Sequence, residues 1–169
     1  MQLGIVTSDI GADLDLGSLL ELCLQTQLDA IELHTADAHG VEPDLTGGER
    51  AAVHAQITEA GLTLWGLGTQ CEFDSPDEDL LTENIRATHG FIELARDLGA
   101  QGVTVRPNGL HADEGVPVET TLKQIAGALR KCAAMAGDAK VQLWLEVYGD
   151  GTGDPVDRKS TRLNSSHRI

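Results

Sequence analysis

The chain has 169 residues, of which 41% are hydrophobic and 23% are charged, which suits one globular domain and excludes an intrinsically disordered chain. No apolar run reaches the roughly 20 residues that a membrane-spanning helix needs. The formal net charge of −15 opposes a sequence-independent grip on the phosphate backbone of nucleic acids, which requires clustered cations. We therefore expect neither a membrane nor a nucleic acid among the partners of this protein.

The first residues and the cysteines bear on the cellular compartment. The run Met1 to Val6 lacks the basic region and the long apolar region of a secretory signal peptide, so we expect a cytoplasmic location. Cys23, Cys71 and Cys132 are odd in number, far apart and without a Cys-x-x-Cys pair. Buried free thiols are therefore expected, rather than a disulfide framework or a structural zinc site.

Five short apolar stretches alternate with sequence of helical period along the chain. Strands buried on both faces of a sheet are apolar throughout, so these stretches predict a parallel sheet covered by helices. The loop after the first stretch holds neither Gly-x-Gly-x-x-Gly nor Gly-x-x-x-x-Gly-Lys-Ser/Thr, and the nucleotide site of an open doubly wound sheet therefore has no support. The predicted strands are Leu3 to Val6, Ala30 to Leu33, Leu62 to Leu67, Gly102 to Val105 and Val141 to Val147.

The helices between these strands have recognisable ends. A first helix is expected over about Leu16 to Gln27. A second begins at a capping box formed by Thr46 and Glu49 and ends at Gly61, because glycine favours the left-handed turn that follows a helix.

The third and fourth helices are longer. Ser75 is the expected N-cap of the third, with Pro76 at its first position and Glu78 at its third, and Gly99 ends it. The fourth ends at Gly137 and carries one apolar face. That face is formed by Leu122, Ile125, Leu129, Cys132 and Met135.

The hydrophobic periodicity stops at Asp157. The run from Asp157 to His167 resembles the translation of a common sequencing-library adapter, so we interpret residues 157–169 as a non-native tail and residues 1–156 as the domain. A genuine disordered polar terminus is the alternative.

Segments around the predicted strand ends resemble the sugar phosphate isomerase/epimerase family, the xylose-isomerase-like TIM barrels. The resemblance implies an α/β fold, a partial (β/α)8 TIM barrel with about the first five strands and four helices on a parallel sheet. Complete barrels typically need about 250 residues, so it also implies a chain truncated at its C-terminus. The matching segments are Ala30 to Leu33 with Asp37 to Glu42, Leu67 to Asp77, Ile92 to Ala100 with Gly102 to Asn108, and Leu145 to Thr152.

Glu146 is the leading candidate for a functional residue. An unpaired carboxylate between Leu145 and Val147 in an apolar strand would cost several kcal/mol, so Glu146 needs a cation or strong hydrogen bonds. The resemblance implies that Glu146 is a metal ligand and an acid/base group at the end of the fifth strand. Strand alternation places Tyr148 on the same side, and Tyr148 is a candidate substrate contact.

Four further residues are candidate substrate contacts at the barrel mouth. Arg106 lies near the end of the fourth strand and suits a bidentate grip on an oxyanion, with a plain ion pair as the alternative. Glu32 and His34 share a face of the second strand, where a satisfied buried polar pair is equally consistent. His39 follows in a loop and either lines the mouth or is exposed.

The resemblance implies that the parent protein is an enzyme, an isomerase or epimerase acting on a small sugar or sugar phosphate. A divalent metal such as Mn²⁺ or Mg²⁺ would polarise the sugar oxygens, and carboxylates would move a proton through an enediolate. We expect the truncated chain itself to be inactive and the full-length parent to form a homo-oligomer.

Two alternatives remain open from the sequence. An endonuclease-type barrel with a multinuclear zinc site shares the fold. Its zinc site requires histidines at the ends of the third and fourth strands, where this chain has Gln70 and Arg106. A non-catalytic fragment that binds no metal is the other alternative.

Overall fold

The computed structural model describes residues 2–107 and 109–146. Strands and helices alternate along this part of the chain, as the hydrophobic pattern predicts. The elements are β1 (Gly4–Val6), α1 (Leu16–Gln25), β2 (Ala30–His34), α2 (Gly47–Glu59), β3 (Thr63–Glu72), α3 (Glu78–Leu98), β4 (Gly102–Arg106), the short 3₁₀ helix η1 (Ala112–Glu114), α4 (Val118–Ala139) and β5 (Gln142–Leu145).

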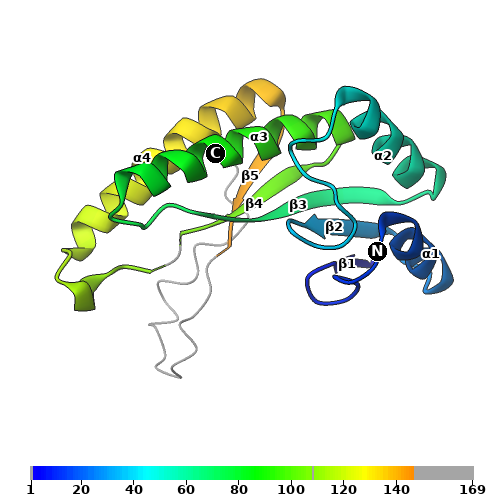
Figure 1. The fold of residues 1–169 in the computed structure, drawn as a ribbon, viewed down its shortest axis with the longest axis horizontal. Helices are drawn as coiled ribbons and strands as arrows, with labels where there is room; N and C mark the ends of the chain where they lie inside the picture. The colour runs from blue at the N-terminus through cyan, green and yellow to red at the C-terminus, as the bar shows by residue number, and fades with distance from the viewer. Residues whose placement is uncertain (1, 108, 147–169) are drawn as a thin grey trace.

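The described strands form one parallel sheet in the order β1-β2-β3-β4-β5. Each strand therefore pairs with the next one along the chain, which is the connectivity of a (β/α)8 barrel. The sheet curves, with β1 and β5 at its two ends (Figure 1). The prediction of a partial barrel with five strands and four helices is confirmed.

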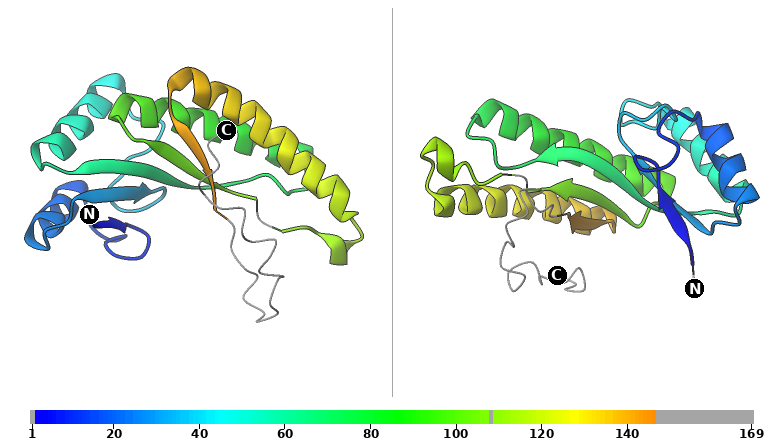
Figure 2. Two further views of the ribbon diagram at one scale, coloured as in Figure 1. Left: turned by 180° about the vertical axis from the view of Figure 1, so that it is seen from behind. Right: turned by 90° about the horizontal axis from the view of Figure 1, so that it is seen from below.

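The core lies between the sheet and the helices, which cover its outer side (Figures 1 and 2). Ile31 and Leu33 of β2 and Val103 and Val105 of β4 are fully or almost fully buried there. These residues are two apart in each strand, so their side chains point to the same face. No described helix covers the inner, concave face (Figure 2).

The helix ends follow the predicted signals with two exceptions, the start of α3 and the end of α4. The capping box of Thr46 and Glu49 is present, and Gly99 ends α3 in the left-handed conformation. The N-cap of α3 is Asp77 and not Ser75, because the Asp77 carboxylate accepts hydrogen bonds from two backbone N–H groups of the first turn. The Ser75 hydroxyl accepts from the Asp77 N–H instead. The prediction that the fourth helix ends at Gly137 is wrong: α4 continues to Ala139 and ends at Lys140, which takes the left-handed conformation and closes the last turn with its N–H on the carbonyls of Ala136 and Gly137.

Cys23, Cys71 and Cys132 are buried free thiols, as predicted. Within residues 2–107 and 109–146, no helix combines the length and the apolar character needed to cross a membrane. Tyr148 and the predicted tail, residues 157–169, lie outside the described residues.

Candidate active site at the carboxyl ends of the strands

An open pocket of about 270 Å³ lies on the concave face, at the carboxyl ends of the strands. In barrels of this kind the residues that do chemistry lie at this end. The structure therefore brings together four of the predicted site residues, which come from three different strands or strand ends. The pocket is lined by Val6, Ser8, Asp9, Glu32, His34, Thr104, Arg106, Trp144, Leu145 and Glu146.

Strand alternation explains why these polar side chains share one face. In β2, Ile31 and Leu33 belong to the core against the helices, and Glu32 and His34 between and after them line the pocket. The same alternation in β4 directs Arg106 into the pocket. In β2 and β4 the face toward the helices is therefore apolar, and the concave face carries the polar side chains of the pocket.

Glycines on the concave face make room for the larger side chains. A Cβ atom at Gly68 would lie 2.8 Å from Cδ2 of His34 and 3.1 Å from Oε1 of Glu32. At Gly102 it would lie 2.5 Å from the ring of Trp144. Trp144 also stacks on Trp65, with 5.2 Å between the ring centroids. Glycine is thus required at these positions for the pocket residues to occupy their places.

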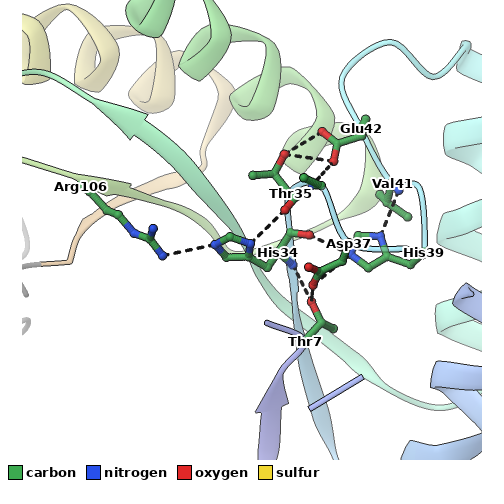
Figure 3. A network of polar contacts seen from close by, with 9 residues as sticks. Thr7, His34, Thr35, Asp37, His39, Val41, Glu42 and Arg106 are labelled. Carbon is green, nitrogen blue, oxygen red and sulfur yellow. Dashed lines mark hydrogen bonds and ion pairs between the residues drawn. The ribbon is translucent and has the colours of Figure 1, made fainter. Parts of the chain in front are cut away.

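Arg106 links the second and fifth strands. Its Nη2 lies 3.3 Å from Nε2 of His34 (Figure 3), and its Nε lies 3.7 Å from Oε2 of Glu146. Glu146 follows β5 directly, and its backbone N–H donates to the Val105 carbonyl over 2.9 Å. Arg106 is therefore a cation next to Glu146, but the Glu146 side chain is 44% exposed and is not the buried carboxylate that the sequence predicted.

His34 is held in one orientation by its surroundings. Its backbone N–H donates to Oγ1 of Thr7 over 2.8 Å, and its Nδ1 lies 3.0 Å from the carbonyl oxygen of Thr35 (Figure 3). A carbonyl only accepts, so Nδ1 is the nitrogen that carries the proton. Nε2 then presents its lone pair to Arg106.

Glu32 has a raised pKa. Burial is the main cause, because it disfavours the charged carboxylate, and the charge of Glu146 raises the pKa further. The hydroxyl of Thr104, which donates to Oε1 of Glu32 over 3.2 Å, opposes this rise. Glu32 therefore holds a proton at a higher pH than an exposed glutamate.

His39 does not line the pocket. Its Nδ1 accepts from the Val41 N–H over 3.0 Å, and its Nε2 donates to the carbonyl of His34 over 2.9 Å (Figure 3). Burial lowers its pKa, so the ring is neutral. These contacts hold the loop behind His34 in place, and a contact between His39 and substrate stays a prediction.

Two groups of polar residues were not singled out from the sequence. Ser8 and Asp9 line the pocket, and the only signal for them is their place directly after the first strand. Outside the pocket, Nε2 of His111 lies 2.9 Å from Oδ2 of Asp74, and its Nδ1 lies 3.0 Å from Oε1 of Glu114. Both carboxylates raise the pKa of His111, and this pairing joins the loops that follow β3 and β4.

The described residues alone do not fit a divalent metal ion. No group of three or more His, Cys, Asp or Glu side chains within this part of the chain is arranged to hold one. The lone pair of His34 faces a guanidinium, and the carboxylate of Glu146 is paired with the same group. Arg106 thus brings a positive charge to the place between these two side chains.

The sequence shows the family to which the chain belongs. The model of the xylose isomerase-like TIM barrel family matches residues 20–163. The chain belongs to this family. No curated protein matches the sequence.

Solved structures share the fold. One of D-psicose 3-epimerase in the presence of D-fructose is 17% identical, with a TM-score of 0.72, over 89% of this chain and 53% of its own. The IOLI protein with a bound zinc atom is 22% identical, with a TM-score of 0.72, over 88% and 52%. The 3-keto-D-glucoside 4-epimerase from E. coli is 14% identical, with a TM-score of 0.65, over 86% and 55%. The chain spans about half the length of these proteins.

Proposed function

We propose that this chain forms the first five strands of a sugar isomerase or epimerase, acting on a small sugar or sugar phosphate. The observation that carries the proposal is the convergence of Glu146, Arg106, His34 and Glu32 on one pocket at the carboxyl ends of the strands. The sugars in the names of the structural neighbours support the substrate class.

The proposed chemistry is a proton transfer next to a carbonyl group. Glu146 takes the proton from the carbon beside the sugar carbonyl, and the C–H electron pair forms the enediolate. A second carboxylic acid, which we expect on the last strand of the complete barrel, returns a proton to the same carbon from the other side and gives the epimer. Return of the Glu146 proton to the former carbonyl carbon, with the hydroxyl proton passing to the other oxygen, gives the isomer. Arg106 donates hydrogen bonds to the oxygen that gains negative charge.

A divalent metal is expected for the complete barrel, with Glu146 as one ligand. The described residues do not complete a ligand set, and we expect the remaining ligands on the sixth to eighth strands. A cytoplasmic location and a homo-oligomer of the complete protein also remain predictions.

The experiment that tests this function completes the barrel. The chain is mixed with a separate polypeptide carrying the sixth to eighth strands of D-psicose 3-epimerase, in D₂O with Mn²⁺ and a ketohexose. We expect deuterium at the carbon beside the carbonyl in the mixture and none with either polypeptide alone. Glu146→Gln abolishes the exchange, since the amide is not a base.

Binding to the chain alone is the second measurement. Both tryptophans of the chain lie on the concave face, and Trp144 lines the pocket, so sugar binding changes the tryptophan fluorescence. A chain that binds no sugar and supports no exchange would contradict the proposal. Zinc-dependent cleavage of DNA by the mixture would instead favour the endonuclease alternative.

A further inference from the structure

The contact between His34 and Arg106 has a directionality that the chemistry of the two side chains determines. Guanidinium groups only donate hydrogen bonds, so His34 accepts through Nε2. Nε2 can accept only if the ring proton is on Nδ1, and the hydrogen bond from Nδ1 to the carbonyl of Thr35 keeps the proton there. His34 therefore contacts Arg106 as one neutral tautomer.

The orientation of the His34 ring is restricted by its packing. The residue is only 7% exposed, and its ring occupies space that a Cβ atom at Gly68 would fill. The backbone of His34 is anchored to Oγ1 of Thr7, which in turn donates to Asp37 over 2.5 Å. The acceptor that faces Arg106 is thus held by the second strand and by the loop after the first.

Arg106 gains a defined position from this acceptor. A long arginine side chain loses rotamer entropy when it is held in place, and a rigid acceptor at one end of the guanidinium limits the conformations that must be given up on binding. Glu146 contacts the guanidinium at Nε, and His34 contacts it at Nη2. Two different strand ends therefore determine where Arg106 points.

We infer that His34 is a positioning residue, which aims the guanidinium of Arg106 at the oxygen of a bound sugar. The inference rests on the proposed function for the identity of the ligand. The positioning itself is a property of the chain without ligand. A plain structural histidine would fill the same space without any effect on Arg106.

The first measurement is made on the unaltered chain. Nitrogen-15 NMR of His34 distinguishes a protonated Nδ1 from a protonated Nε2. We expect the Nδ1–H form, with Nε2 hydrogen-bonded and unprotonated. A protonated Nε2 at neutral pH would overturn the inference without any variant.

Two substitutions separate the two nitrogens of His34. In His34→Gln the amide oxygen reaches the position of Nε2 and keeps an acceptor for Arg106. In His34→Asn the amide reaches only the position of Nδ1 and keeps the contact with Thr35. We expect nitrogen-15 relaxation of the Arg106 Nε–H to report a rigid side chain in the wild type and in the Gln variant and a mobile one in the Asn variant.

Sugar affinity tests the functional part. We expect His34→Asn to weaken ketohexose binding about tenfold, the effect of losing one hydrogen bond to a charged group, and His34→Gln to stay within about threefold. The matched control is His54→Asn. His54 also contacts a backbone carbonyl through Nδ1, that of Leu98 over 2.8 Å, but it lies on α2 and not in the pocket, so it leaves Arg106 and the sugar affinity unchanged.

The outcomes are distinguishable from a failure of the proposed function. A wild-type chain that binds no ketohexose contradicts that function, and the Arg106 relaxation still decides the positioning. Equal effects of the Gln and Asn variants on Arg106, or none, overturn the inference even if sugar binds. Retained Arg106 order with lost affinity in the Asn variant overturns it as well.

Discussion

The two faces of the sheet are built from the same strands and follow opposite rules. Toward the helices, alternate residues such as Leu33 and Val103 are almost completely buried and apolar. On the concave face several intervening positions are charged or polar, as Glu32 and Arg106 are, or are glycine, and the tryptophan Trp144 packs among them. Burial of apolar area holds the fold together, whereas the concave face gives up such burial to present polar groups in a pocket. Stability and function therefore depend on different residues of the same strands.

The largest expected effect comes from the helix-covered face. Leu33→Ala removes a side chain that is 1% exposed, and it should lower the free energy of unfolding by about 2–5 kcal/mol because it leaves a cavity in the core. Urea unfolding measures the loss. Glu32→Gln, next to it on the concave face, keeps the shape of the side chain and should change stability much less. Equal losses would contradict the division between the faces.

A smaller loss of stability is expected at Gly102 on the concave face. Gly102→Ala places a Cβ atom 2.5 Å from the ring of Trp144 and should cost about 1–3 kcal/mol by overpacking, with a change in tryptophan fluorescence. The double variant with Trp144→Ala should remove most of this cost. Gly127→Ala in α4 meets nothing within 4 Å and should stabilise the chain by up to about 1 kcal/mol. An unchanged free energy of unfolding in Gly102→Ala would contradict the position of the Trp144 ring against Gly102.

The pKa of Glu32 responds to its neighbours with opposite signs. Glu146→Gln should lower it, since a repelling charge is removed, and Thr104→Val should raise it, since a donor to the carboxylate is lost. Carbon-13 NMR titration of the Glu32 carboxyl group measures both shifts. Shifts of the same sign would show that these contacts do not set the pKa.

The raised pKa of Glu32 makes the stability of the chain depend on pH. The folded chain binds the Glu32 proton more tightly than the unfolded chain, so stability falls as pH rises from the ordinary glutamate pKa of about 4.3 through the higher folded value. Glu32→Gln should remove this decline. Urea midpoints measured across that range for both chains test it.

The smallest effect concerns the pair of loops outside the pocket. The pKa of His111 is raised by Glu114 and Asp74, so its contribution to stability is fully present below the ordinary histidine pKa of about 6.5 and is lost as pH rises through the folded value, while both acids stay ionised. His111→Gln should therefore destabilise the chain at pH 6 more than at pH 8–9. A difference that is independent of pH would exclude the charged pairing.

Much of the fold is predictable because its signals are local. The apolar stretches mark the strands, and the capping box at Thr46 marks the start of α2. The prediction of Ser75 as the N-cap of α3 was wrong, because both Ser75 and Asp77 have side chains that can cap a helix. Only the backbone geometry selects Asp77. The third strand is longer than expected, ending at Glu72, because its polar end is stabilised by pairing with Arg106 of β4.

By itself the sequence determined the βα order, the family resemblance and the identity of the residues at the strand ends, because apolar period and strand alternation act within a few residues. Only the tertiary structure decided which of them meet. Arg106 contacts a histidine 72 positions earlier. Glycine is needed at Gly102 only because a neighbouring strand brings the Trp144 ring against it. The tautomer of His34 and the backbone contacts of His39 were decided in the same way. Distances between strands depend on the curvature and register of the whole sheet, and no local pattern encodes them.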